Sequence, residues 1–158
     1  MRNNFISRGY LGNILMGGYA ANRGNALNVI VVNNTTYQGT NGEIELQNNC
    51  DGITIKNNIL YARTGQSYVS QSGGNNTNIM VGSNIYFGAS ITSPGPFPDL
   101  LARFVNPLLI GPPADLHLLV GSPAIDAGIN LGNDAQGQPS RVSRTSMGGP
   151  ASMGSPSI

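Results

Sequence analysis

Pairs of asparagine recur at a nearly constant spacing through the first half of the chain. Counted from the second residue of each pair, the intervals are 30, 24 and 26 positions, with a Ser-Asn dipeptide in place of the last pair. The dipeptides are Asn3-Asn4, Asn33-Asn34, Asn57-Asn58 and Ser83-Asn84. This repeat constrains the fold, because a unit of about 20 to 30 residues built of short strands cannot bury its own apolar face. Successive units must therefore stack on one another.

Apolar residues flank the dipeptides in a fixed register. They lie five and three positions before the second residue of the pair, and ten positions after it. These positions hold Val29, Ile53 and Ile79, then Val31, Ile55 and Val81, then Ile14, Ile44 and Tyr68. Alternation with period two predicts strands on both sides of the pair. We therefore expect an all-β protein in which residues 1–93 form a solenoid, a parallel β-helix of about three to five coils.

The asparagines themselves suit the corners of such a solenoid. A sharp bend between two strands needs a residue that tolerates left-handed backbone angles, and asparagine does so at low cost. Stacked at a spacing of roughly 4.8 Å, equivalent amides can also donate and accept along a column. The spacing predicts that this asparagine ladder consists of Asn4, Asn34, Asn58 and Asn84.

Charge and hydropathy exclude two classes of partner. Eight Lys and Arg residues face seven Asp and Glu residues, so the chain lacks the field that attracts nucleic acid or an acidic membrane. No apolar run reaches the roughly 18 to 20 residues that cross a bilayer. The opening MRNNFISRGYLGN lacks the apolar segment of a secretory signal, so either export is absent or the start has been removed.

Two stretches resemble the right-handed parallel β-helix superfamily of pectate-lyase-like proteins. NGEIELQNNCDGITIKNNILYAR follows the order of a coil: a glycine-started strand, a turn, a strand ending in asparagine, and a third strand. FVNPLLIGPPADLHLLVGSPAIDAGIN, followed by DAQGQPSR, resembles the closing segment of bacterial secreted members. The resemblance implies a right-handed, single-stranded helix and an extracellular or cell-surface protein acting on polysaccharide.

The sequence after the repeats divides into two parts. Residues 94–141 are expected to close the same domain, with Leu118, Ala124 and Ile125 covering the apolar cross-section of the last coil. Residues 142–158 are rich in Ser, Gly, Met and Pro and are expected to be disordered. The chain also opens inside a coil. Either it is the C-terminal part of a longer protein or another subunit covers that coil, and both predict self-association through residues 3–20.

Glu43 and Glu45 are the candidate catalytic pair. If Ile44 and Leu46 point inward, alternation places both carboxylates on one solvent face, in the sheet that the resemblance implies as the substrate groove. Such a pair could bind calcium, could act as acid and base at a glycosidic bond, or could simply solvate the strand. The resemblance further implies a basic residue that removes a proton beside a uronate. Lys56 is a candidate for this catalytic role, and Arg63 for substrate binding.

The sequence leaves two functions open. The leading interpretation is the C-terminal part of an extracellular protein that binds or cleaves an acidic polysaccharide, with calcium as a possible cofactor. The alternative is a non-catalytic structural or adhesive solenoid. An aromatic column at Tyr37, Tyr61 and Phe87 fits either a sugar-stacking platform or a packed stack.

Overall fold

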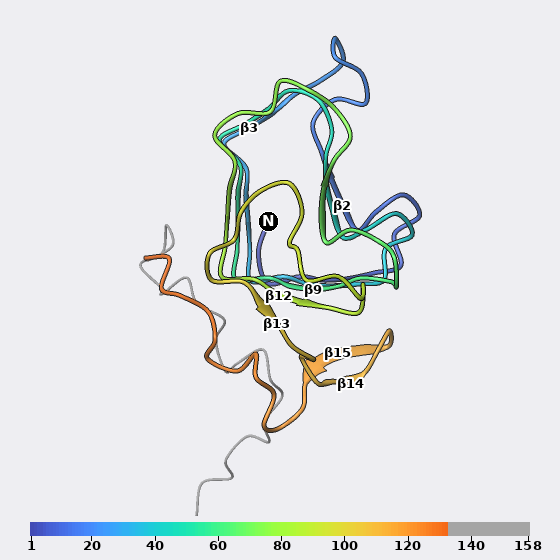
Figure 1. The fold of residues 1–158 in the computed structure, drawn as a ribbon, viewed down its shortest axis with the longest axis vertical. Helices are drawn as coiled ribbons and strands as arrows, with labels where there is room; N and C mark the ends of the chain where they lie inside the picture. Colours follow the sequence, from blue (N-terminus) through green and yellow to red (C-terminus); the bar gives the residue numbers. More distant parts are fainter. Residues whose placement is uncertain (133–158) are drawn as a thin grey trace, which may run out of the picture.

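The computed structural model describes residues 1–132, and within them the chain forms only strands, turns and loops (Figure 1). The strands are β1 (Phe5–Ser7), β2 (Ile14–Met16), β3 (Ala26–Leu27), β4 (Ile30–Val32), β5 (Thr35–Tyr37), β6 (Ile44–Leu46), β7 (Cys50–Asp51), β8 (Thr54–Lys56), β9 (Ile59–Tyr61), β10 (Val69–Gln71), β11 (Met80–Gly82), β12 (Ile85–Phe87), β13 (Arg103–Phe104), β14 (Leu109–Gly111) and β15 (Asp115–Leu118). This part of the chain contains no helix that could span a membrane. The expected all-β class is confirmed.

Most strands pair in parallel with the strand one repeat away. One sheet has the order β1-β5-β9-β12-β13, a second β2-β6-β10, a third β4-β8-β11, and β3 pairs with β7. Each of the first three repeats thus contributes one strand to each of three sheets. Figure 1 shows the successive passes of the chain superimposed in one outline, with the five-stranded sheet along its lower side. The spacing of the asparagine pairs sets this register, since Thr35 lies opposite Ile59 and Ile59 opposite Ile85.

The core runs through the space enclosed by the three sheets. Its most buried aliphatic members, none more than 1% exposed, include Val31, Leu46, Ile55 and Leu60. They sit at alternate positions of strands, as the period of two predicted. Burying each such side chain stabilises the fold by roughly 1.5–3 kcal/mol.

The two residues of each pair have different structural roles. The first member adopts a left-handed backbone, with φ of 57° at Asn3, 56° at Asn33, 56° at Asn57 and 56° at Ser83. The second member makes the column of hydrogen bonds. A serine therefore suffices at the bend but not in the column, which explains why only the first position varies.

The column has one direction throughout. Asn34 donates from its backbone N and its Nδ2 to Oδ1 of Asn58, both at 3.0 Å. Asn4 donates in the same way to Asn34, and Asn58 to Asn84. Because these amides are buried, each bond satisfies a group that would otherwise be costly to desolvate.

The C-terminal end of the stack is closed by the segment after β12. In Figure 1 this segment curves back across the interior of the outline before reaching β13. Phe97, Ala102 and Phe104 pack against the core there, and the Phe104 ring stacks on Tyr86 with centroids 5.2 Å apart. Asp99 lies beside them and receives the last bonds of the asparagine column.

The residues expected to form the lid lie elsewhere. Leu118 and Ala124 pack with Ile59 and Ile85 against the outer face of the five-stranded sheet, not over the end of the stack. The antiparallel hairpin β14-β15 covers the adjoining part of that face through Leu109 and Leu116. The expectation of an end cap at these positions is wrong, because the aromatic residues before β14 already fill the cross-section. The remainder of the predicted closing segment, 133–141, and the predicted disordered tail, 142–158, lie outside the described residues.

Candidate functional site

Glu43 is enclosed, contrary to the expectation that it faces solvent. It is 0% exposed and lies in the turn just before β6. One carboxylate oxygen accepts from the backbone N of Gly39 at 3.0 Å and the other from Nδ2 of Asn13. Burial raises the pKa of Glu43, and hydrogen bonds from Thr36, Asn13 and Gly39, together with the positive charge of Arg63, only partly oppose this. Strand alternation does not apply to a residue in a turn, which is why the sequence argument failed here.

Glu45 occupies the middle of β6 and is partly exposed. Its side chain accepts a hydrogen bond from the Ser72 hydroxyl. Its neighbours in the sheet are Leu15 and Ser70. The predicted alignment of Ile44 with Tyr68 is therefore wrong by one residue, since Ile44 lies opposite Val69. The turn from β9 to β10 is one residue longer than that from β5 to β6, and this insertion shifts the residues of β10 by one.

The two carboxylates therefore do not form a pair open to substrate. A general acid and a general base must both reach the scissile bond. One of these carboxylates is sealed inside a turn and the other is bound to a serine. Within residues 1–132 no group of three or more His, Cys, Asp and Glu side chains is placed to hold a metal ion.

The two basic candidates lie on different sheets. Lys56 ends β8, in the sheet that does not contain Glu45, and its aliphatic stem lies over Gly82 of the next strand. Arg63 follows β9, at the corner leading towards the β2-β6-β10 sheet. It is exposed, and its Nε donates to the backbone O of Gln38 at 3.1 Å. The structure thus brings none of Lys56, Arg63 and Glu45 into one catalytic cluster.

The predicted aromatic column is present but partly covered. The rings of Tyr37 and Tyr61 have centroids 4.8 Å apart, and those of Tyr61 and Phe87 4.9 Å, both edge to face. Leu109 and Leu116 of the hairpin pack over Tyr37, which is 8% exposed. The hairpin therefore covers the Tyr37 end of the column, whereas Tyr61 and Phe87 are partly exposed.

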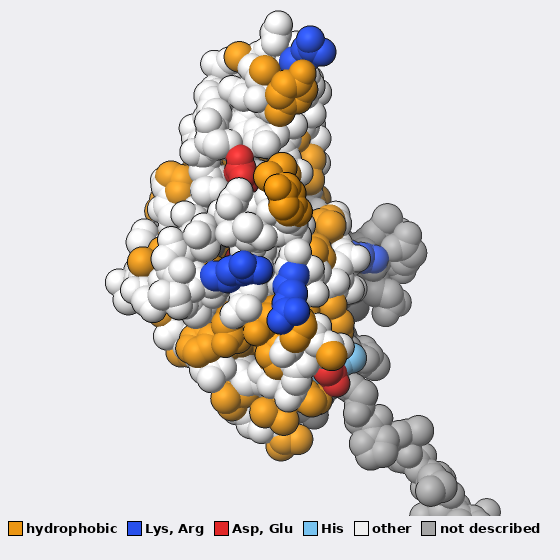
Figure 2. Space-filling view, turned by 90° about the vertical axis from the view of Figure 1, so that its right-hand side faces the viewer, with side chains coloured by type: hydrophobic (Ala, Val, Ile, Leu, Met, Phe, Trp, Pro, Cys, Tyr) orange, Lys and Arg blue, Asp and Glu red, His pale blue; other side chains and the backbone are white. Residues whose placement is uncertain are grey.

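Within residues 1–132, no segment packs on the outer face of the β2-β6-β10 sheet. The described C-terminal segment lies on the five-stranded sheet instead. Figure 2 looks onto the side of the molecule that carries β2, and it shows Lys and Arg side chains gathered midway along this side, with hydrophobic side chains towards the lower end. This face carries the row Leu15, Glu45 and Ser70. Arg63 lies in the turn between β9 and β10, where its charge acts on Glu43 just before β6.

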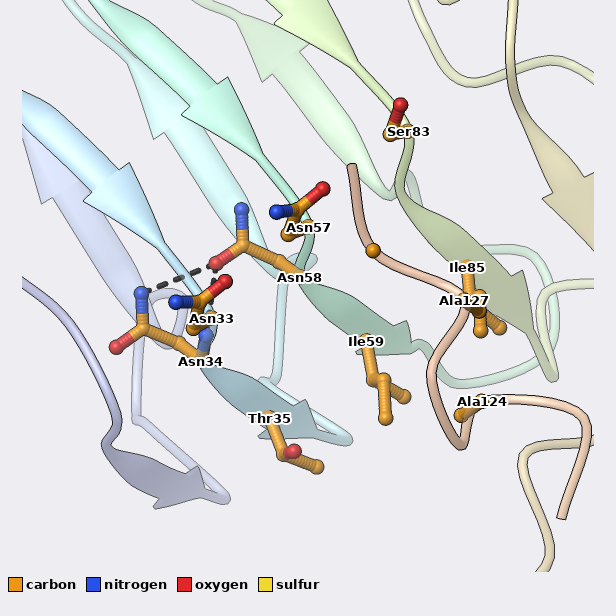
Figure 3. Close-up of a pocket in the computed structure, with 11 residues that line it drawn as sticks. Asn33, Asn34, Thr35, Asn57, Asn58, Ile59, Ser83, Ile85, Ala124 and Ala127 are labelled. Atoms are coloured by element: carbon orange, nitrogen blue, oxygen red, sulfur yellow. Dashed lines mark hydrogen bonds between the residues drawn. The ribbon is translucent and has the colours of Figure 1, made fainter. Parts of the chain in front are cut away.

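A small cavity lies on another corner, where the sequence indicated only a bend. It has a volume of about 30 Å³, enough for a water molecule, and lies between the asparagine corners and the segment around Ala124 to Gly128 (Figure 3). The Asn57 side chain there binds the backbone of Ile129 twice, with Nδ2 donating to O at 2.8 Å and Oδ1 accepting from N at 3.0 Å. No repeat spacing signals this contact, because the partners lie 72 residues apart.

Comparisons with known proteins assign no relative. No family model matches the chain, and neither the curated proteins nor the solved structures contain a match.

Proposed function

We propose that residues 1–132 form a right-handed, single-stranded parallel β-helix of the pectate-lyase-like kind. The support is the pairing of strands one repeat apart in three parallel sheets, together with the buried asparagine column at one corner. Figure 1 gives the outline expected when each repeat makes one turn around a common axis.

We further propose that the protein binds an acidic polysaccharide along the open β2-β6-β10 face. Arg63 is the residue that would bind a uronate carboxylate. Its Nε is fixed by the Gln38 carbonyl, and its two terminal nitrogens have no acceptor within residues 1–132. A guanidinium held in this way offers two parallel donors to a carboxylate. This guanidinium, whose terminal nitrogens have no partner within residues 1–132 and whose charge also acts on the buried Glu43, is the observation that carries the proposal.

Binding is favoured over cleavage because the candidate catalytic groups are not available. Glu43 is buried and hydrogen-bonded, Glu45 is bound to Ser72, and Lys56 lies on another sheet. The proposal therefore assigns no acid, base or nucleophile to this chain. An extracellular or cell-surface location, and a place at the C-terminal end of a longer secreted protein, are part of the same proposal and follow from the resemblance.

Affinity electrophoresis through gels containing polygalacturonate, alginate or neutral dextran tests this function. We expect retardation by the two uronate polymers, none by dextran, and loss of retardation in Arg63→Gln. Lys56→Gln serves as the matched control, since it removes one positive charge from another sheet. Equal mobility of Arg63→Gln and the unmodified protein in uronate gels would remove Arg63 from the proposal. Release of unsaturated products, followed by ultraviolet absorbance with and without calcium, would contradict the non-catalytic assignment.

A structural or adhesive solenoid is the second candidate. It is favoured because polar side chains near the corners, including Glu43 and the ladder asparagines, form hydrogen bonds within and between the repeats. Mobility unchanged in every polysaccharide gel, with a correctly folded protein, would favour this function.

A further inference from the structure

The loop between β2 and β3 projects beyond the outline that the other repeats share (Figure 1). It comprises residues 17–25, whereas the equivalent connection of the next repeat, between β6 and β7, comprises only residues 47–49. A further repeat that followed the common outline would leave the tip of this loop uncovered. The exposure of its side chains is thus a property of the loop and does not depend on the residue at which the sequence begins.

Backbone contacts hold this loop in place. Gly18 and Asn48 of the next repeat exchange two backbone hydrogen bonds, at 2.9 and 3.0 Å. The Nδ2 atom of Asn49 donates to two backbone oxygens of the loop, at 2.9 and 3.1 Å. The tip is closed by a bond from Arg23 N to Ala20 O at 2.9 Å. None of these bonds uses a side chain of residues 17–25, so the conformation of the loop rests on its backbone.

The tip of the loop presents an aromatic ring beside a guanidinium. Tyr19 is 74% exposed, and Cζ of Arg23 lies 5.9 Å from the centroid of its ring. A cation in this position over an aromatic face is attracted by the ring. Arg23 is itself exposed, and its guanidinium has no hydrogen-bond acceptor within residues 1–132. The loop therefore combines an open aromatic face with unused N–H donors.

We propose that Tyr19 and Arg23 form a second contact for an acidic polysaccharide, in addition to Arg63; this inference rests on the proposed function. A uronate unit carries apolar C–H groups on the face of its ring and a carboxylate at its edge. The open face of Tyr19 offers an apolar surface to the sugar ring. The planar guanidinium of Arg23 offers parallel N–H donors to the carboxylate. The two side chains thus match the two parts of one uronate unit.

The two contacts lie at opposite ends of the β2-β6-β10 sheet. The charge of Arg63 acts on Glu43, which lies just before β6. The Tyr19 loop is bound to Asn48, which lies just after β6. Five residue steps of an extended strand cover about 17 Å, so one uronate unit cannot reach both contacts, whereas a longer chain can. Glu45 lies between them and would repel a uronate carboxylate, so attraction is confined to the two ends.

Isothermal titration calorimetry of the full 158-residue chain with oligogalacturonates of increasing length tests this inference. For the unmodified protein we expect the affinity to rise at the length that spans about 17 Å. Tyr19→Ala should lose this rise, with an affinity for polygalacturonate lowered about fivefold, or about 1 kcal/mol. Tyr19→Phe keeps the ring and should bind as the unmodified protein does. Arg23→Gln removes the donors to the carboxylate and should weaken binding to a similar extent.

Unfolding in urea separates loss of binding from loss of structure. Because the loop is fixed through its backbone, Tyr19→Ala and Arg23→Gln should keep the urea midpoint of the unmodified protein, and either variant is sufficient if the other misfolds. Lys56→Gln, which removes one positive charge from another sheet, should leave the affinity for polygalacturonate unchanged.

Two outcomes would overturn the inference, and they differ in what they say of the proposed function. If Tyr19→Ala and Arg23→Gln bind polygalacturonate as tightly as the unmodified protein, while Arg63→Gln binds it weakly, the second contact is wrong and the proposed function stands. If the unmodified protein binds no oligogalacturonate of any length, both are wrong.

Discussion

The carboxylate of Asp99 stands where the next asparagine of the column would stand. Asn84 donates to Oδ2 of Asp99 from its backbone N and from its Nδ2, both at 3.1 Å, as each earlier asparagine donates to the amide oxygen of its successor. The second oxygen accepts from Ser83 N and Leu101 N, and the Tyr86 hydroxyl donates to Oδ2 at 2.8 Å. Burial and this carboxylate raise the pKa of Tyr86, so it stays a donor. The carboxylate of Asp99 thus ends the column, in which every bond from one asparagine side chain to the next is donated forward.

Asp99→Asn should therefore destabilise the protein although it preserves shape. The amide NH₂ would replace an oxygen that accepts at least two N–H or O–H bonds, leaving buried donors facing one another. We expect a loss of about 3 kcal/mol in the free energy of unfolding, measured by urea denaturation. Asp115→Asn, on the exposed side of the hairpin, is the control and should change stability by less than about 1 kcal/mol.

Asn33→Gly should stabilise the protein. Asn33 has a left-handed backbone, and its buried Oδ1 has no hydrogen-bond partner within the described residues. Glycine adopts this backbone without strain and removes the unpaired oxygen, at the cost of greater freedom when unfolded. We expect a net gain of roughly 0.5–1 kcal/mol in thermal or urea unfolding. Asn33→Ala, which keeps the strain, should instead destabilise; equal effects of the two substitutions would contradict the role of the backbone angle.

Asn58→Ala should be far more damaging than a change at the first position of a pair. Its Oδ1 accepts both bonds from Asn34, and its Nδ2 donates to Val31 O, Lys56 O and Asn84 Oδ1. Removing the amide leaves several buried groups unsatisfied, so we expect a loss of about 3–5 kcal/mol or failure to fold. Circular dichroism during urea titration measures this. The exposed Gln71→Ala is the control, and a similar loss there would contradict the importance of the column.

The stability of the protein should rise as the pH falls from 7 towards 4.5, through Glu43. Its pKa in the folded state is raised above the usual 4.5, so the folded protein binds a proton more tightly than the unfolded chain. The resulting stabilisation is fully present below 4.5 and is lost as the pH rises through the folded-state pKa. Glu43→Gln should flatten this dependence, whereas Glu45→Gln should keep it. Urea midpoints between pH 4.5 and 7 provide the measurement, and parallel curves for the two variants would exclude Glu43 as the source.

Much of the fold is predictable from spacing because the repeat enforces it. The pairing of Thr35 with Ile59 and the column through Asn34 and Asn58 both follow from a 24-residue interval. Positions inside strands are likewise fixed by alternation. The ladder asparagines follow from the same spacing, because a buried side-chain amide needs hydrogen-bond partners and the equivalent asparagine of the next repeat is the nearest one.

The candidate site was less predictable because it depends on turns and on contacts remote in sequence. Glu43 sits in a turn, where no period governs side-chain direction, and a single extra residue before β10 moves Ser70 opposite Glu45. Asp99 follows a different local sequence from the asparagines and cannot be aligned with them. The contact between Asn57 and Ile129 joins the repeats to a segment that does not repeat.

The single direction of the asparagine column makes the length of this protein adjustable. The side-chain oxygen of each interior asparagine accepts hydrogen bonds from the preceding repeat, and its side-chain nitrogen donates to the following one. A duplicated block such as 35–58 would therefore find the same hydrogen-bond partners at both of its junctions. Growth or shrinkage by whole repeats would leave the acidic end of the column, at Asp99, chemically unchanged. Repeats could thus be added to or removed from this protein without any new kind of contact between neighbouring asparagines.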